Sequence, residues 1–268
     1  MITVEQLQGG VVIPIDKPRQ WTSFQTVNKV KAVIRNHFGL KKFKIGHAGT
    51  LDPLATGLLL VCVGRATKKI EQLQAGEKVY TGTMVLGATT PCFDQEQPID
   101  HFYPFDHINP TLLEEVRQQF VGQLEQVPPM FSAVKIEGRR AYEYARADDP
   151  SAQPVAKTVQ IHEFRIIDYR KRDTGTSINN IQQSKNDQVV INNLHKYNNP
   201  VEDIPDQLPQ LDFYIRCGKG TYIRSIARDL GLALQSGAYI SALRREQVGD
   251  YRIEDAVPLE HVERFLTQ

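Results

Sequence analysis

Short apolar runs and helical repeats follow one another irregularly along this chain, and that order restricts the folds open to it. Apolar and β-branched runs bounded by glycine, proline or polar residues predict strands at 10–15, 58–63, 79–86, 132–136, 155–169, 211–217 and 239–243. Helical spacing of apolar residues predicts helices at 22–34, 66–73, 109–120, 140–146, 223–234 and 258–265. Strands and helices do not alternate regularly, which favours an α+β fold over a parallel βαβ arrangement.

Two local features sharpen these predictions. Thr22 or Ser23 is suited to cap the first long helix, whose expected apolar face includes Phe24. Glu114 stands three residues after Thr111, a spacing typical of a capping box.

The segment 171–209 breaks the pattern. It is rich in Asn, Gln, Asp and Ser and has three prolines without a sustained period. We expect an exposed, partly disordered insertion within a single domain that spans 1–268.

Composition excludes several classes of protein. The 268 residues are 41% hydrophobic, and no apolar run is long enough to span a bilayer. The N-terminus lacks the basic and apolar regions of a signal peptide. The three cysteines, Cys62, Cys92 and Cys217, lie far apart, which argues against a disulfide or a zinc site. We therefore expect a cytoplasmic protein that does not bind a membrane.

Charge is unevenly distributed, although the net charge is only +1. Between residues 17 and 70 there are eleven Lys and Arg residues and a single carboxylate, Asp52. Such a stretch is either a solvated basic face or a surface that attracts a polyanion. The cations around Asp52 are expected to hold it ionised.

Motifs that bind common cofactors or metals are missing from the sequence. It contains neither a G-x-G-x-x-G nor a phosphate-binding P-loop motif, and neither H-E-x-x-H nor G-x-S-x-G. We expect no cofactor and no metal. The remaining candidate is Gly46–Leu58, in which small residues flank Asp52 and Pro53 places the aspartate on a loop. Asp52 is then either a nucleophile or base, or a turn residue that caps the next segment.

This stretch resembles the central motif of the TruB family of tRNA pseudouridine synthases, H-x-G-x-L-D-P-x-A-T-G, at every defined position. Further resemblances follow in family order and cover about residues 10–170 and 211–250. They are Asp16-Lys17-Pro18 with Thr22-Ser23, Lys78-Val79-Tyr80, Pro128–Lys135, Tyr142–Arg146, Lys219–Arg224 and Leu243-Arg244-Arg245.

The resemblance implies a pseudouridine synthase fold, with a mixed, mainly antiparallel sheet flanked by helices and the catalytic loop in a central RNA-binding cleft. It implies a single catalytic domain, a monomer without an obligate protein partner, and the T-arm of tRNA as substrate, modified at uridine 55. Two departures stand out. The 171–209 segment has no counterpart in the usual family pattern, and about twenty residues follow Leu243-Arg244-Arg245, so we expect no C-terminal PUA-like domain of normal size.

The resemblance also implies roles for individual residues. Asp52 is implied to be the catalytic carboxylate, Tyr80 to stack on the flipped uracil, and Arg224 to pair with Asp52. Arg224 falls in the first turn of its helix, from which its side chain is expected to lean out of the core. The remaining candidates are implied to bind the RNA; they are His47, Gly49, Thr50, Leu243 and the possible phosphate contacts Lys17, Lys41, Lys42, Lys44 and Lys135.

Three other functions are weighed against this one. A non-catalytic module that binds or folds tRNA would use the same basic surface, but the Asp, Tyr and Arg residues of the motifs are all present. A synthase that depends on a guide RNA is disfavoured by the absence of long lysine-rich tails. An unrelated Asp-dependent hydrolase would need a metal cluster that the sequence lacks.

Overall fold

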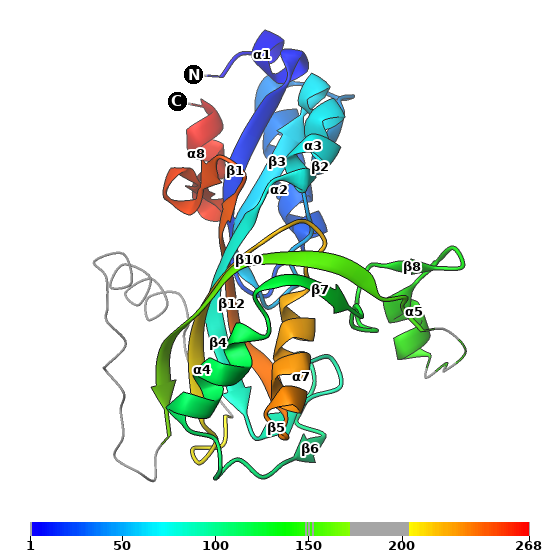
Figure 1. The fold of residues 1–268 in the computed structure, drawn as a ribbon. Helices are drawn as coiled ribbons and strands as arrows, with labels where there is room; N and C mark the ends of the chain where they lie inside the picture. Colours follow the sequence, from blue (N-terminus) through cyan, green and yellow to red (C-terminus); the bar gives the residue numbers. More distant parts are fainter. Residues whose placement is uncertain (1, 148, 150, 152, 172–203, 268) are drawn as a thin grey trace. The chain divides into compact units, whose positions relative to one another are not determined.

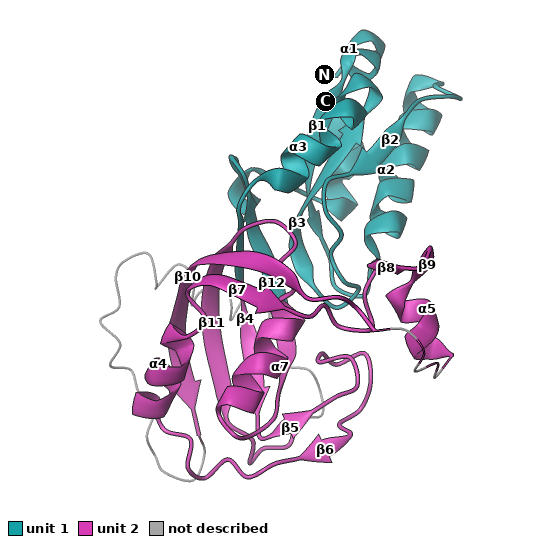
Figure 2. Ribbon diagram, turned by 45° about the vertical axis from the view of Figure 1, so that its right-hand side comes forward, with its two compact units in different colours: residues 1–80, 243–268 teal, residues 81–242 magenta. Residues whose placement is uncertain are grey.

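The structure is a computed structural model that describes residues 2–147, 149, 151, 153–171 and 204–267 (Figure 1). The chain divides into two compact units, residues 1–80 with 243–268 (unit 1) and residues 81–242 (unit 2), coloured separately in Figure 2. The chain passes between the units within two strands, β4 (Lys78–Leu86) and β12 (Ala238–Val248). The expectation of a single catalytic domain stays a prediction.

Unit 1 contains both described ends of the chain. Its other elements are α1 (Val4–Gly9), β1 (Val11–Lys17), α2 (Ser23–Phe38), β2 (Ile45–His47), β3 (Thr56–Val63), η1 (Gly64–Lys69), α3 (Ile70–Ala75), β13 (Tyr251–Arg252), η3 (Ile253–Asp255), β14 (Val257–Pro258), η4 (Leu259–His261) and α8 (Val262–Thr267).

Strand β3 is the centre of unit 1. It pairs antiparallel with β1 and β2, and parallel with β12, where Arg244 faces Thr56 and Arg245 faces Gly57. Residues 58–63 are fully buried, as a strand covered on both faces requires. Leu58 and Leu60 pack with Ala48, which places the start of the loop between β2 and β3 against the core.

Helix α2 begins as expected, and of its expected apolar face Phe24 alone is exposed. Thr22 is its N-cap and forms a capping box with Gln25, and the left-handed Gly39 ends it. The buried side chains include Thr26, Val27, Val30, Val33 and Ile34. The prediction that Phe24 joins this face is wrong, because at 100° per residue Phe24 lies about 120° from its centre; its side chain is 70% exposed.

Unit 2 is built on the remaining strands of the sheet. Besides β4 and β12 it contains β5 (Ala88–Thr89), β6 (His101–Phe102), α4 (Pro110–Gln118), β7 (Gly122–Gln126), β8 (Lys135–Ile136), β9 (Arg139–Arg140), α5 (Ala141–Arg146), β10 (Lys157–Arg170), β11 (Gln210–Cys217) and α7 (Ile223–Ala233). The hydrogen-bonded order of the main sheet is β14-β1-β3-β12-β4-β11-β10-β7. Parallel and antiparallel pairs both occur in it, which confirms the mixed sheet of an α+β fold.

Three sequence predictions in unit 2 are corrected. Strand β7 was not expected, because its exposed residues alternate with few apolar ones. The strand expected at 132–136 is reduced to the hairpin strand β8. The capping box at Thr111 is wrong, since Asn109 caps α4 and Glu114 instead accepts hydrogen bonds from Arg117.

The predicted insertion 171–209 lies mostly outside the described residues, and its last two residues, Leu208 and Pro209, are buried. Leu208 is buried against Val85, Ala88 and Tyr239, and the N–H of Leu86 donates to the carbonyl of Pro209. Because the segment is polar as a whole, its composition did not predict that its apolar end is buried. The chain has therefore rejoined the core before residue 210.

Gly57 marks the closest approach between strands β3 and β12. Its φ is +100°, and a Cβ atom would lie 2.4 Å from the carbonyl oxygen of Arg245 and 2.8 Å from its nitrogen. Both neighbours are backbone atoms of a paired strand and have little room to move. Gly39, by contrast, has a φ of +64° and open space around it.

We expect Gly57→Ala to lower the free energy of unfolding by about 3–5 kcal/mol, combining backbone strain with steric displacement of β12. Gly39→Ala is the matched control: it introduces the backbone strain of a positive φ without a steric clash, and it should cost about 1–2 kcal/mol. Urea unfolding of both variants measures the difference. Equal losses of unfolding free energy in the two variants would show that the close contact between Gly57 and the backbone of Arg245 adds nothing to the cost of the substitution.

Candidate active site

Asp52 lies on the loop between β2 and β3, as predicted from Pro53. The loop starts from the core, because the N–H of the buried Ala48 donates to the carbonyl of Leu60 at 2.9 Å. It ends in a tight turn, in which the N–H of Ala55 donates to the carbonyl of Asp52 at 3.2 Å. Residues on both sides of Asp52 are therefore held by backbone hydrogen bonds.

The start of α2 holds the residues next to Asp52. The buried Ser23 hydroxyl donates to the carbonyl of Leu51 at 3.0 Å and accepts from the N–H of Leu51 at 2.9 Å. On the other side, the N–H of Gln20 donates to the carbonyl of Pro53 at 2.8 Å. Because Thr22 caps the helix, Ser23 remains available for the loop.

Lys17 is a structural cation beneath this loop. Its side chain is fully buried, and its ammonium donates to the carbonyls of Trp21 at 2.6 Å, Pro18 at 3.0 Å and Pro53 at 3.3 Å. Burial lowers the pKa of Lys17 to about 8, while the nearby negative charge of Asp52 raises it. A phosphate contact by Lys17 is not compatible with this burial, because its three hydrogen atoms already have carbonyl acceptors.

Arg245 holds the first half of the loop. Its guanidinium is 1% exposed and donates to the carbonyls of Leu58 at 2.8 Å, Gly49 at 3.1 Å and Thr50 at 3.4 Å. Gly49 and Thr50, which were predicted to touch RNA, are thus fixed through their backbone oxygens. The Thr50 side chain is exposed beside them.

A second arginine joins β12 to β1. Arg244 forms a bidentate ion pair with Asp16, with distances of 2.8 and 3.0 Å, and its side chain is 3% exposed. Its guanidinium also donates to the hydroxyl of Thr56 at 3.4 Å, while that hydroxyl donates to the carbonyl of Leu243 at 3.5 Å. This network fixes the backbone of Leu243, whose side chain is half-buried.

His47 and Tyr80 also belong to unit 1. His47 ends β2 and is half-buried; burial lowers its pKa, and the positive charge of Arg245 lowers it further. The imidazole is therefore neutral at pH 7. Tyr80 is 9% exposed on β4. Their contacts with a base or RNA strand stay predictions.

Arg224 and Lys135 are placed in unit 2. The expectation that Arg224 leaves the core is wrong: it is 4% exposed, and its guanidinium donates to the carbonyls of Phe131 at 2.8 Å and Cys92 at 3.0 Å. It also lies 3.5 Å from the buried carboxylate of Asp94. Lys135 is exposed on β8. The pairing of Arg224 with Asp52 stays a prediction.

Several residues that hold the candidate residues within each unit were not found from the sequence. Asp94 lies in an irregular segment without a motif, so no pattern indicated its ion pair with Arg224. Asp16, Arg244 and Arg245 lie within recognised motifs, but their spacing along the chain does not reveal their partners. Ser23 was recognised as a possible cap, and its bond to Leu51 was not.

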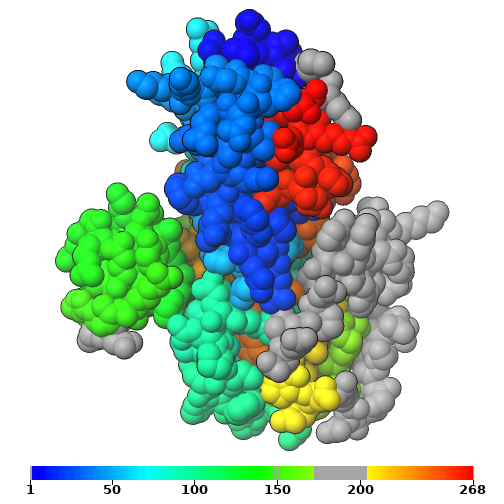
Figure 3. Space-filling model, turned by 180° about the vertical axis from the view of Figure 1, so that it is seen from behind, coloured from blue at the N-terminus to red at the C-terminus, as the bar shows by residue number. Residues whose placement is uncertain are grey.

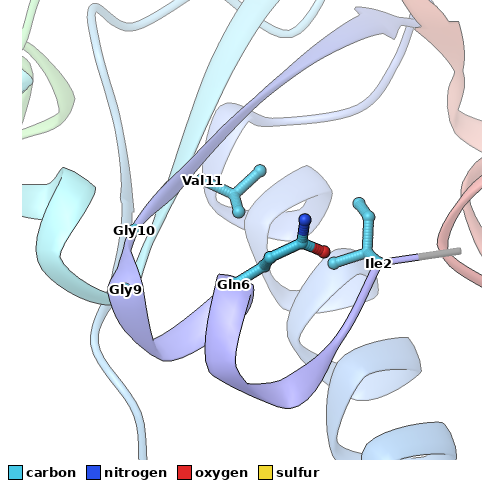
Figure 4. Close-up of a pocket in the computed structure, with 5 residues that line it drawn as sticks. All are labelled: Ile2, Gln6, Gly9, Gly10 and Val11. Carbon is cyan, nitrogen blue, oxygen red and sulfur yellow. The ribbon is translucent and has the colours of Figure 1, made fainter.

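Other possible sites offer less chemistry. A shallow pocket between α1 and the start of β1 is lined by uncharged residues, with Gln6 as the polar side chain among them (Figure 4). Within the described residues, no group of three His, Cys, Asp or Glu side chains is arranged to hold a metal ion. Those residues also include no helix long and apolar enough to cross a membrane.

Comparison with family models gives two matches. The model described as TruB family pseudouridylate synthase (N terminal domain) matches residues 35–189, and tRNA pseudouridylate synthase B C-terminal domain matches residues 224–268. The first match continues into the segment expected to be an insertion. The second begins within α7 of unit 2 and ends in unit 1. The expected lack of a PUA-like domain stays a prediction.

Curated relatives match along nearly the whole chain. The tRNA pseudouridine synthase B of Flavobacterium johnsoniae is 45% identical over 99% of this chain and 100% of its own length. The protein of the same name from Phocaeicola vulgatus is 42% identical over 97% of this chain and 94% of its own.

Among solved structures, a chain of a Cbf5-Nop10-Gar1 complex has a TM-score of 0.61 at 24% identity, covering 97% of this chain and 55% of that one. This chain thus spans about half the length of that structure, and the likeness concerns the fold alone. The family models and the curated relatives carry the assignment: the chain belongs to the TruB family of pseudouridylate synthases.

Proposed function

We propose that this protein isomerises uridine 55 in the T-loop of tRNA to pseudouridine, with Asp52 as the catalytic carboxylate. The observation that best supports this proposal is the loop around Asp52, whose backbone Ser23, Lys17 and Arg245 hold through hydrogen bonds. A catalytic group must be held close to its productive position before the substrate arrives. The names of the curated relatives support tRNA as the substrate.

The reaction requires that the N1–C1′ bond of the uridine breaks, that the uracil rotates, and that a C5–C1′ bond forms. C5 then loses its proton and N1 carries one, so the atoms balance without an external oxidant or reductant. Asp52 serves as the nucleophile of this sequence. The buried side chains of Lys17 and Arg245 place positive charge beside the loop that carries Asp52.

The target uridine must leave its stack before Asp52 can reach it. Tyr80 supplies an aromatic face for the flipped uracil, and Leu243 an apolar edge. His47, whose pKa is lowered by burial, helps to open and hold the RNA through hydrogen bonding rather than charge. Arg224 orients Asp52, and Asp94 in turn holds Arg224.

We expect Asp52→Asn to abolish detectable pseudouridine formation and to leave tRNA binding intact or slightly tighter. The amide has nearly the same volume but cannot act as the nucleophile, and one negative charge leaves a basic surface. Asp250→Asn, the same chemical change at an exposed position of unit 1, is the matched control and should behave as wild type. Carbodiimide sequencing of tRNA measures the product, and filter binding measures affinity.

If Asp52 instead caps a turn, its replacement should cost about 1 kcal/mol of stability and leave turnover in place. A folded Asp52→Asn protein with near-normal activity would exclude the catalytic assignment. Product at a tRNA position outside the T-loop would exclude the proposed substrate site while leaving the chemistry intact.

The basic segment predicts a strong dependence of binding on salt. Each phosphate neutralised should contribute about −0.7 to −0.9 to the slope of log affinity against log salt concentration. Lys41, Lys42 and Lys44 are all exposed, so their combined replacement by Glu should flatten the slope by about 2. Affinity measured between low and physiological salt tests this. An unchanged slope would show that the RNA does not lie along these residues.

A further inference from the structure

We infer that Trp21 and Phe24 form a stacking surface for nucleobases of the RNA beside the target uridine. Trp21 is 36% and Phe24 70% exposed, and they stand three residues apart at the start of α2. Single exposed apolar residues are common on proteins. Trp21 precedes the N-cap and Phe24 follows it, so two large exposed aromatic residues occur close together beside the loop of Asp52. Isolated exposure does not explain such a pair.

The helix start does not bury Trp21 in the usual way. An apolar residue just before the N-cap commonly packs against the fourth residue of the helix. Here that residue is Thr26, which is buried and whose hydroxyl donates to the carbonyl of Thr22 at 3.1 Å. The indole is therefore not covered by an apolar staple, and the capping box still holds its backbone in place.

The backbone of Trp21 is tied to that of Pro53, the residue after Asp52. The carbonyl of Trp21 accepts a hydrogen bond from Lys17 at 2.6 Å, and the same ammonium reaches the carbonyl of Pro53. Gln20, which precedes the pair, has a φ of +64° and donates to the same carbonyl. A non-glycine residue in this region costs free energy and is frequent at functional sites.

Charge on the same helix indicates the kind of partner. Phe24, Asn28, Lys31 and Arg35 follow one another at helical spacing, and all four are exposed. We call these four residues the α2 stripe. Helix α2 lies behind the strands of unit 1 in Figure 1, and the view from behind in Figure 3 shows its blue residues at the surface. Aromatic rings combined with cations are typical of surfaces that bind single-stranded nucleic acid. A polyanion with flat bases therefore fits this stripe better than an apolar protein partner.

This inference rests on the proposed function, since it assigns the α2 stripe to the same RNA. The chain offers a direct probe, because Trp21 is its single tryptophan. We would titrate Asp52→Asn protein with a T-arm stem–loop RNA and record tryptophan emission. Stacking of a base on the indole should quench the emission saturably. A change in emission that depends on the protein concentration rather than on the RNA concentration would reveal contact between two copies of the chain and would overturn the inference.

Replacement of Phe24 separates stacking from simple apolar contact. Phe24→Leu should raise KM and Kd by roughly 5- to 100-fold with kcat retained, since one base–aromatic stack is worth about 1–3 kcal/mol. Phe24→Tyr retains the aromatic face and should remain near wild type. Phe265→Leu, at another exposed phenylalanine of unit 1, is the matched control and should change neither constant.

An RNA series identifies the base. T-arm RNAs with an abasic site at each loop position in turn should include one for which Phe24→Leu no longer weakens binding. Wild-type affinity in Phe24→Leu, or equal losses in Phe24→Leu and Phe24→Tyr, would overturn the stacking surface. Neither result affects the proposed function, which is tested separately by the position of the product in tRNA and by the activity of Asp52→Asn.

Discussion

The buried guanidinium of Arg245 is the interaction on which the loop of Asp52 depends. It satisfies three backbone carbonyls, of which two belong to the loop itself. A buried carbonyl without a donor costs about 1–3 kcal/mol, so this loop conformation is stable only while the guanidinium is present. Arg245 in turn reaches the loop because Gly57 lets the backbone of β12 approach β3 without a Cβ atom between them. Small residues near Asp52 thus serve the packing of the protein's own backbone.

Local features of this region could be predicted from the sequence, whereas long-range partners could not. Pro53 restricts the backbone of Asp52 directly, and the cap at Thr22 depends on residues three positions apart, so both predictions are confirmed. The ion pair between Asp16 and Arg244 joins residues 228 positions apart. Spacing along the chain contains no information about such a pair. Lys17 shows the same limit, because a lysine beside proline and arginine is normally solvated.

The helix α7 illustrates why Arg224 was misjudged. Helical periodicity correctly placed Ile223, Ala227 and Leu230 in the core. It also treats every arginine as polar and therefore exposed. A guanidinium can be buried when carbonyls accept its hydrogen bonds and a carboxylate forms an ion pair with it; here Cys92 and Phe131 provide the carbonyls and Asp94 the carboxylate. All three residues come from irregular segments, in which neither a period nor a motif predicts a position.

At the beginning of α2, neighbouring residues cap the helix and bind the loop of Asp52. Thr22 caps the helix, which leaves the Ser23 hydroxyl for Leu51 and directs Phe24 away from the buried face. Lys17 bonds to both Trp21 and Pro53, so the residues before and after this cap are tied to those beside Asp52. The backbone at Trp21 is therefore connected to the loop of Asp52 through short hydrogen bonds rather than through a flexible linker. Under the proposed function, this connection couples the binding of neighbouring bases at the start of α2 to the placement of the Asp52 carboxylate.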